Sequence, residues 1–382
     1  MNRIDHRKRI MCGVLLAWAA LLGLGLSGSS VSSGGQEGQR ILRKWIPTRI
    51  PGGTDFAGTQ ACQECHQSKA KVYATNPMSF ALERVPDAVI LKANRKLTYQ
   101  QGKYRYEIVR QGDQSIYSVT DGMTTVSEPI FYSFGQGQAG QTYVLRHRGE
   151  YYESRVSYYR DVQALDLTIG YLETKPQTVL EAFGRKLSHD EVAQCFSCHA
   201  TNAASNSQLH LDKLMPGITC ESCHGPGGDH IAAGKEGLPN KDKIFNPGKL
   251  SGDELSQEFC GACHRGIEKI IPRNSQDGIF NVRFQPYRIF NSKCYSDDNR
   301  ISCLACHNAH EPLKRDVDHY DAKCMACHQG GQPKAEGMAP VCRVGKQDCA
   351  SCHMPKVDLP GAHFKFTDHR IRIVRPGDPY PN

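Results

Sequence analysis

Long apolar stretches are scarce in this 382-residue chain. Beyond residue 26 the sequence has no extended hydrophobic run, hydrophobic residues make up only 39% of it, and tryptophan occurs twice. Cysteine is abundant at 17 residues, yet it is missing for the 129 residues between Cys65 and Cys195. Later cysteine groups begin only 21 to 43 residues apart, and segments so short cannot each build an apolar core. These absences exclude a series of small independent domains in the second half of the chain.

The cysteines recur in one pattern, in which two cysteines separated by two residues are followed directly by histidine. One copy is Cys220-Glu221-Ser222-Cys223-His224. Composition alone predicts about 0.03 copies by chance, so the pattern is not accidental. C-x-x-C-H is the attachment pattern of haem c: the thiols add to the haem vinyl groups and the histidine binds the iron. The seven copies begin at Cys62, Cys195, Cys220, Cys260, Cys303, Cys324 and Cys349.

Structural zinc and a disulfide framework are the alternatives for so many cysteines. Zinc ribbons pair two C-x-x-C units but do not require a histidine after every second cysteine, and disulfides do not require one either. The pattern therefore predicts seven covalently bound haem c groups. The attaching residues are Cys62, Cys65, Cys195, Cys198, Cys220, Cys223, Cys260, Cys263, Cys303, Cys306, Cys324, Cys327, Cys349 and Cys352. The proximal iron ligands are His66, His199, His224, His264, His307, His328 and His353.

Residues 1–26 are typical of an export signal. Four basic residues between Arg3 and Arg9 precede an apolar run from Ile10 to Leu26, and small residues follow it. The run is long for a signal peptide and lacks a clear cleavage site, so removal and retention as an N-terminal membrane anchor both stay open. Export agrees with covalent haem attachment. We expect a periplasmic protein, either free or anchored to the inner membrane by this segment.

The formal net charge of +8 does not indicate a nucleic-acid-binding protein. Residues 1–26 hold four basic residues and one acidic residue, so the remaining chain carries about +5. Seven haems bring two propionates each, about −14 in total, which reverses the sign of the charge. We therefore expect no nucleic-acid partner.

The spacing of the motifs and the composition divide the chain into six parts. The gap without cysteine contains alternating stretches such as Lys103–Val109 and Ser115–Thr120, with turn residues at Asp121-Gly122, which predict a β-meander of five or six strands. We expect this insert to be a scaffold that covers the haems, or a module that docks a partner or shields a substrate. The six parts are the signal or anchor (1–26), a linker (27–57), the first haem segment (58–91), the β-rich insert (92–175), a six-haem core (187–370) and a C-terminal tail (371–382).

The ligand on the opposite, distal side of each iron decides what that haem does. A second strong ligand closes the iron and suits it to electron transfer, whereas an open position admits a substrate. Outside the motifs and residues 1–26, eight histidines remain, and a methionine thioether also binds haem iron. These nine are enough to close all seven irons. The distal candidates are Met78, His147, His189, His210, His230, His310, His319, His363 and His369.

Two of these histidines follow a motif so closely that they cannot reach the far side of their own haem. His310 lies three residues after His307, and His230 lies six after His224. We expect each to serve a neighbouring haem. A lone histidine is otherwise a surface or core residue, and Met78 has the alternative role of filling a gap in the core.

Three segments resemble the multihaem cytochrome c superfamily: Cys220–His230, Cys303–His310 and Cys349–Pro355. That superfamily includes electron-transfer cytochromes of ammonia oxidisers, pentahaem nitrite reductase and octahaem hydroxylamine oxidoreductase. The chain is also similar to exported bacterial multihaem cytochromes that are often joined to tetratricopeptide repeats, although it has no such repeats. The resemblance covers about residues 58–376. It implies short helices and irregular loops wrapped around stacked haems, with a β-rich insert.

The same resemblance implies two distal ligands. Thr75–Phe80 and Thr367–His369 match segments of those exported cytochromes, which assigns Met78 and His369. In the nitrite reductases a lysine replaces the motif histidine at the catalytic haem. All seven motifs here end in histidine, so that chemistry is not expected and no residue is assigned to catalysis.

The sequence thus predicts a seven-haem electron carrier that works between redox partner proteins, with a membrane quinol-linked complex as one candidate partner. An oxidoreductase that acts on a small nitrogen or sulfur compound at one five-coordinate haem is the alternative. A structural subunit of a membrane redox complex is a third interpretation. Outside the motifs, Cys294 and Cys342 are either a disulfide or two free thiols.

Overall fold

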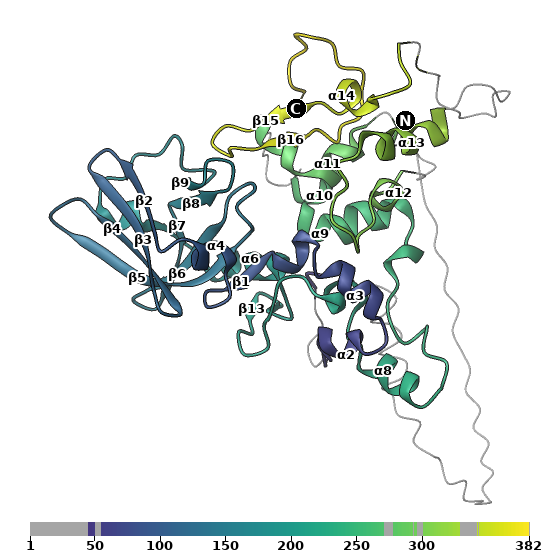
Figure 1. Cartoon of the computed structure of the whole chain (residues 1–382), viewed down its shortest axis with the longest axis horizontal. Helices are drawn as coiled ribbons and strands as arrows, with labels where there is room; N and C mark the ends of the chain where they lie inside the picture. The colour runs from purple at the N-terminus through teal and green to yellow at the C-terminus, as the bar shows by residue number, and fades with distance from the viewer. Residues whose placement is uncertain are drawn as a thin grey trace, which may run out of the picture.

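The computed structural model describes residues 45–49, 55–270, 278–292, 294–295, 301–328, 342 and 344–381. The signal or anchor and most of the linker therefore lie outside the described residues. Within the described ranges, none of the helices is long and apolar enough to cross a membrane. Figure 1 shows two regions: a curled β-sheet, and beside it a column of short helices that runs from α2 and α8 at one end to α13 and α14 at the other.

The β-rich part is an antiparallel sheet with the strand order β10-β7-β6-β5-β4-β3-β2, and β1 pairs with β5. Strands β8 and β9 form a separate ladder. The insert predicted over 92–175 with five or six strands contains eight, β2 to β9, and the flanking strands β1 and β10 join the same sheet. The strands are β1 (Leu82–Arg84), β2 (Lys96–Gln101), β3 (Tyr104–Gln111), β4 (Gln114–Thr120), β5 (Thr125–Phe134), β6 (Thr142–His147), β7 (Glu150–Ser154), β8 (Val156–Tyr159), β9 (Ala164–Leu167) and β10 (Gly184–Lys186).

Alternation of side chains gives this sheet a conventional apolar core. Along β3, Tyr104, Tyr106 and Ile108 are buried, as expected when successive residues point to opposite faces. They join a cluster of 22 buried residues that includes the ring of Tyr117. The sheet region therefore has its own core.

The column consists mainly of one- and two-turn helices separated by loops, and each C-x-x-C-H motif overlaps a helix. Among the helices of the described residues, only α6 and α13 have more than eight residues. The helices near the first three motifs are α2 (Thr59–Gln63), α3 (Gln67–Tyr73), α4 (Val89–Ala93), α5 (Val179–Phe183), α6 (His189–His199), α7 (Cys220–His224) and α8 (Gly228–Lys235). Those farther along are α9 (Gly261–His264), α10 (Ile267–Ile270), α11 (Gln285–Phe290), α12 (Cys303–Cys306), α13 (Val317–His328) and α14 (Cys349–His353).

Short irregular elements complete the column. The 3-10 helices are η1 (Pro77–Phe80), η2 (Pro247–Lys249) and η5 (Gly278–Arg283), and η3 (Glu254–Cys260) is a π-helix. Three two-stranded ladders are β11–β14 (Ala200–Thr201 with Met215–Pro216), β12–β13 (Ala204–Ser205 with Gln208–Leu209) and β15–β16 (Lys356–Asp358 with Lys365–Thr367).

Buried apolar residues become fewer along the column from the sheet towards the C-terminal motifs. A second cluster joins the sheet to α6 through Tyr132, Phe134 and Phe196, whose rings meet edge to face at 5.1–5.2 Å. A third cluster has four buried members, among them Trp45, whose Nε1 donates to the Ser222 carbonyl at 2.9 Å. Among the described residues after Cys260, the buried hydrophobic ones are Ala262, Ile270, Val282, Phe284, Leu359 and Ala362. Side chains alone thus provide little interior for this half of the chain.

Candidate haem sites

Each motif presents its two thiols and its histidine from one short helical turn. In the first motif the N–H of His66 donates to the Cys62 carbonyl at 2.9 Å, and His307 makes the same bond to Cys303. Residues three and four apart on a helical turn lie on one face, so the thiols and the imidazole point to one side. All fourteen motif thiols are free and at least partly exposed. Cys294 and Cys342 are also free thiols.

Three motif histidines lie opposite a second histidine. The ring centroids of His66 and His230 are 6.2 Å apart and their planes meet at 15°. For His224 and His310 the values are 5.9 Å and 14°, and for His307 and His369 they are 6.2 Å and 43°. Within each pair the two histidines come from different haem segments or from the C-terminal region. Distal candidates His230, His310 and His369 are therefore each brought to a proximal histidine of another segment.

The spacing of these pairs fits an iron ion between the rings. Two metal–imidazole bonds of about 2 Å each, with about 1 Å from each nitrogen to its ring centroid, sum to roughly 6 Å between centroids. A porphyrin supplies four nitrogens, so haem iron requires only two axial ligands from the protein. Within the described ranges, no group of three or more His, Cys, Asp and Glu side chains converges as a protein-only metal site.

Hydrogen bonds to backbone carbonyls orient the imidazole rings. The Nδ1 of His224 donates to the Phe245 carbonyl, and that of His230 donates to the Asn240 carbonyl, each at 2.9 Å. His369 donates to the Thr367 carbonyl at 3.0 Å. A carbonyl oxygen can only accept, so the proton resides on Nδ1 and Nε2 keeps its lone pair for a metal.

Burial keeps several of these rings in the neutral form that binds metal. It lowers the pKa of His369 to about 4 and also lowers the pKa of His199 and His264. The pKa of His307 is lowered as well, first by burial and then by the charge of His319. Loss of water around an imidazole disfavours its cationic form, so a metal meets little competition from protons at neutral pH.

Two further motif histidines are anchored in the same way without a second histidine ring stacked on them. The Nδ1 of His199 donates to the Ala81 carbonyl, and that of His353 donates to the Arg372 carbonyl, both at 2.9 Å. The Phe134 ring packs edge-on against His199 at 5.3 Å. His199 lies close enough to His264 of the fourth motif to act on its pKa, but among the described residues no histidine ring stacks on His199 or His353. The structure thus presents some motif histidines in pairs and others singly.

Three of the other distal candidates have ring nitrogens engaged elsewhere. His147 and Glu128 are 2.7 Å apart on the sheet, and His363 Nε2 lies 2.7 Å from Asp166. His210 Nε2 contacts the Ser205 hydroxyl at 2.8 Å. Among the described residues, none of these three rings lies beside a motif histidine. His147 packs against Tyr152 and Phe183 instead, and His363 packs against Tyr159.

The remaining candidates lie near motifs. His189 is the first residue of α6, which carries the second motif. Met78 is half-buried and its carbonyl accepts from the Ile218 N–H, next to the third motif. His319 packs against Tyr320 at 5.1 Å. It also lines a cavity of about 270 Å³ together with Leu304, His307, Leu313 and Lys323. This cavity borders the fifth motif, so it belongs to the space available to that haem.

Interactions between thiols show which motifs are neighbours. The neighbouring thiol of Cys62 lowers the pKa of Cys220 to about 7, and that of Cys260 does the same for Cys303. Cys263 lowers the pKa of Cys198 to about 6. A fourth thiol contact joins Cys324 and Cys349. First and third, second and fourth, fourth and fifth, and sixth and seventh motifs are therefore adjacent.

Weaker electrostatic contacts join the remaining neighbours. Cys223 of the third motif acts on the pKa of Cys260 and Cys263 of the fourth. Cys306 of the fifth is influenced by Cys324 and Cys327 of the sixth. The motifs thus form one connected row, in the order first, third, fourth, fifth, sixth and seventh, with the second attached beside the fourth.

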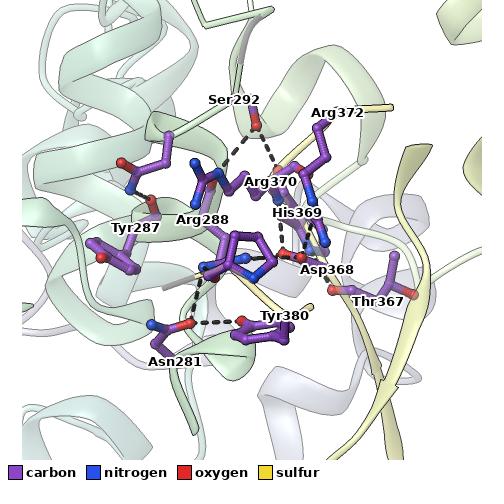
Figure 2. Close-up of polar contacts among 12 residues, drawn as sticks. Asn281, Tyr287, Arg288, Ser292, Thr367, Asp368, His369, Arg370, Arg372 and Tyr380 are labelled. Carbon is purple, nitrogen blue, oxygen red and sulfur yellow. Dashed lines mark hydrogen bonds and ion pairs between the residues drawn. The ribbon is translucent and has the colours of Figure 1, made fainter. Parts of the chain in front are cut away.

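Two buried acidic residues near the motifs escaped the sequence analysis. Glu221, 1% exposed, accepts hydrogen bonds at 2.8 Å from the N–H groups of Ala57, Gly58 and Gly227. It lies between the cysteines of the third motif, where any residue is allowed, so the pattern carried no signal. Asp368 is fully buried beside His369 and binds Arg288 (Figure 2). Its partner lies 80 residues away, which no local pattern reveals.

Comparison with known proteins supports the nature of these sites. Residues 168–225, which include the motifs at Cys195 and Cys220, match the family described as cytochrome c554 and c-prime. A cytochrome c-554 of Nitrosomonas europaea is 34% identical over 87 residues, covering 19% of this chain and 35% of the relative. The chain thus spans about a third of that relative's length. No solved structure matches. These similarities support a multihaem c-type cytochrome with covalently bound haem c.

Proposed function

We propose that this chain is an exported seven-haem cytochrome that relays electrons between redox partner proteins. The observation that carries the proposal is the row of adjacent motifs, which contains all seven attachment sites. Bound haem would supply an iron centre that accepts and releases one electron at each site. The match of residues 168–225 to the cytochrome c554 and c-prime family supports an electron-transfer role.

The protein residues would hold the irons in states suited to transfer. His66 with His230, His224 with His310, and His307 with His369 would each provide two axial nitrogens, which closes the iron to substrates. Carbonyl anchors on Nδ1 keep the rings from rotating and so limit rearrangement when the charge of the iron changes.

We infer the path of the relay from the helical column. The first and third motifs lie at the end near α2 and α8, and the seventh lies at the other end on α14 (Figure 1). We infer that electrons enter near one end and leave near the other, with the fourth motif, on α9, as the junction to the second motif. Partner proteins, a membrane quinol-linked complex among them, would dock at the ends of the column.

A second function is favoured by the anchored but singly placed rings of His199 and His353. If one of them is the only protein ligand of its iron, that haem is five-coordinate. It would then bind a small nitrogen or sulfur compound, and the protein would be an oxidoreductase. Low-spin haems would deliver electrons to that site.

Electron paramagnetic resonance of the oxidised, purified protein, with haem counting by the pyridine haemochrome method, separates the two functions. A relay should show seven haems per chain and low-spin ferric signals only. A high-spin signal that integrates to one haem, and that changes on addition of nitrite, hydroxylamine or sulfite, favours the enzyme. Fewer than seven haems in fully loaded protein contradicts the proposed row.

A further inference from the structure

The buried ion pair of Arg288 and Asp368 occupies an unusual position in this fold. Both side chains are completely buried. The Arg288 Nε donates to Asp368 Oδ1 at 2.8 Å and its Nη2 donates to Oδ2 at 2.9 Å, so the two groups meet in a fork that fixes their relative orientation. Arg288 lies on α11, whereas Asp368 directly follows β16.

Surrounding residues hold the Arg288 guanidinium on its remaining sides. Its Nη1 donates to Asn281 Oδ1 at 3.1 Å and to the Pro381 carbonyl at 2.9 Å. The Tyr380 ring lies 4.6 Å from the guanidinium carbon, and the Tyr380 hydroxyl donates to Asn281 Oδ1 at 2.7 Å (Figure 2). Four of the five N–H donors of Arg288 thus have protein partners, which fixes the position of its guanidinium.

Asp368 is tied to the chain that follows it. Its Oδ1 accepts from the Arg370 N–H at 3.0 Å, and its Oδ2 accepts from the Arg372 guanidinium at 2.6 Å. The Ser292 hydroxyl donates to the His369 carbonyl at 2.8 Å and accepts from the Ile371 N–H at 2.7 Å. The backbone from residue 368 to 372 is thus held by hydrogen bonds to Arg288 on α11 and to Ser292, two residues beyond the end of α11.

This fastened segment reaches two motif histidines. It contains His369, whose ring faces His307 of the fifth motif. The Arg372 carbonyl accepts the Nδ1 proton of His353 of the seventh motif, and the Arg372 N–H donates to the His353 carbonyl at 3.2 Å. We propose that Arg288 and Asp368 form a positioning clamp that sets the distal ligand of the fifth haem and orients the proximal ligand of the seventh.

The clamp has a physical reason to be ionic. The 368–372 segment has few apolar contacts, because Leu359 and Ala362 are the described buried hydrophobic residues beyond Phe284. A buried carboxylate with two guanidinium partners has one low-energy geometry, since any displacement leaves a charge unpaired. An apolar contact of the same size would let the 368–372 segment slide along α11, and the His369 ring would move with the segment.

The inference rests on the proposed function, because it needs haem at the fifth and seventh motifs. The test uses full-length, haem-loaded protein with the substitutions Asp368→Asn and Arg288→Met, and Arg155→Met as the control. Arg155 is also buried and hydrogen-bonded, to Gln101 and Thr174, but it lies in the sheet region away from the motifs. The readouts are haem count, electron paramagnetic resonance and a spectroscopic redox titration.

The clamp predicts seven haems in the Asp368→Asn variant, loss of one haem equivalent of low-spin signal, and shifts in two midpoint potentials. The control should lose thermal stability with an unchanged spectrum. Unchanged spectra and potentials in folded Asp368→Asn would overturn the clamp, whatever happens to stability. Arg372→Met is a milder variant for the case that Arg288→Met does not fold, because it leaves the Arg288–Asp368 pair intact. It should still shift the midpoint potential of the seventh haem. An unchanged potential of that haem contradicts the proposal.

A third variant separates failure of the clamp from failure of the haem assignment. His369→Ala should abolish the same low-spin signal directly. If His369→Ala leaves every signal unchanged, His369 is not an iron ligand and that part of the proposed function is wrong. If His369→Ala removes the signal but the clamp variants do not, only the positioning role is wrong.

Discussion

The rings of His224 and His310 lie 5.9 Å apart and only 14° from parallel, although the two residues are separated by more than 80 positions in the chain. Besides burial and the charge of His224, Lys69 on α3 and the adjacent Glu311 act on the pKa of His310, so the first haem segment also contributes to the surroundings of this ring. The pair joins the loop after the fifth motif to the third motif, and therefore two stretches that the sequence separates by the whole fourth motif.

This pairing predicts a change of spin state when His310 is replaced. His310→Ala should convert one haem equivalent from low-spin to high-spin, because the iron held by His224 loses its second imidazole. Electron paramagnetic resonance of the oxidised protein measures the change. The matched control is His147→Ala, since His147 binds Glu128 on the sheet. A low-spin spectrum that survives His310→Ala unchanged would show that the ring has another role.

The buried carboxylate of Glu221 stabilises the start of the first haem segment, so its replacement should lower the free energy of unfolding. Glu221→Gln replaces one acceptor oxygen by an N–H₂ group that faces the N–H of Ala57, Gly58 or Gly227. A buried donor that loses its acceptor costs about 1–3 kcal/mol, and denaturant unfolding should show a loss of that size. Glu236→Gln, at the exposed end of α8, is the control and should change the midpoint little. Equal midpoints for both variants would contradict the anchoring role.

Glu191 should stabilise α6, the helix of the second motif, to a degree that depends on pH. It forms a capping box with Ser188 at the start of α6. The backbone hydrogen bond from Ser188 and then the bond from Arg185 lower its pKa to about 2. Because the folded pKa lies below the unfolded value of 4.5, the stabilisation is complete above pH 4.5 and is lost as the pH falls towards 2.

The experiment compares wild type with Glu191→Gln in unfolding measurements across that range. The side chain is 42% exposed, so the difference should be at most about 1 kcal/mol at pH 7 and should shrink below pH 4.5. Asp190→Asn, an exposed neighbour in the same turn, is the control. A difference that is constant with pH would mean that the charge of Glu191 is not involved.

The row of motifs predicts unequal effects of removing single attachment sites. Replacing both cysteines of the seventh motif, Cys349 and Cys352, by serine should lower the haem count from seven to six and leave the other signals in place. The same change at Cys260 and Cys263 removes the motif that borders the second, third and fifth. It should therefore lower the yield of folded protein or slow electron transfer between the two ends, measured by stopped-flow reduction. Equal effects of both changes would contradict a junction at the fourth motif.

Some features of this protein follow from local sequence alone. Two thiols and an imidazole within five residues form an attachment site in any short helical turn, so Cys62–His66 needs no distant partner to be recognised. The short distance from His307 to His310 excludes a shared haem, and this restricted His310 to a neighbour before the fold was known. Alternation along Lys103–Val109 likewise indicates a strand, because side chains of a strand alternate between two faces.

Other features were decided only by tertiary structure. β1 and β10 have three residues each and become strands because β5 and β7 offer free edges for pairing. His147, His210 and His363 were equal candidates in the sequence, but the fold places them beside Glu128, Ser205 and Asp166 rather than beside a motif histidine. The pairing of Arg288 with Asp368 requires α11 and the segment after β16 to meet. Only the three-dimensional packing of the chain brings such distant residues within hydrogen-bonding distance, so local patterns define the attachment sites whereas the tertiary fold selects their partners.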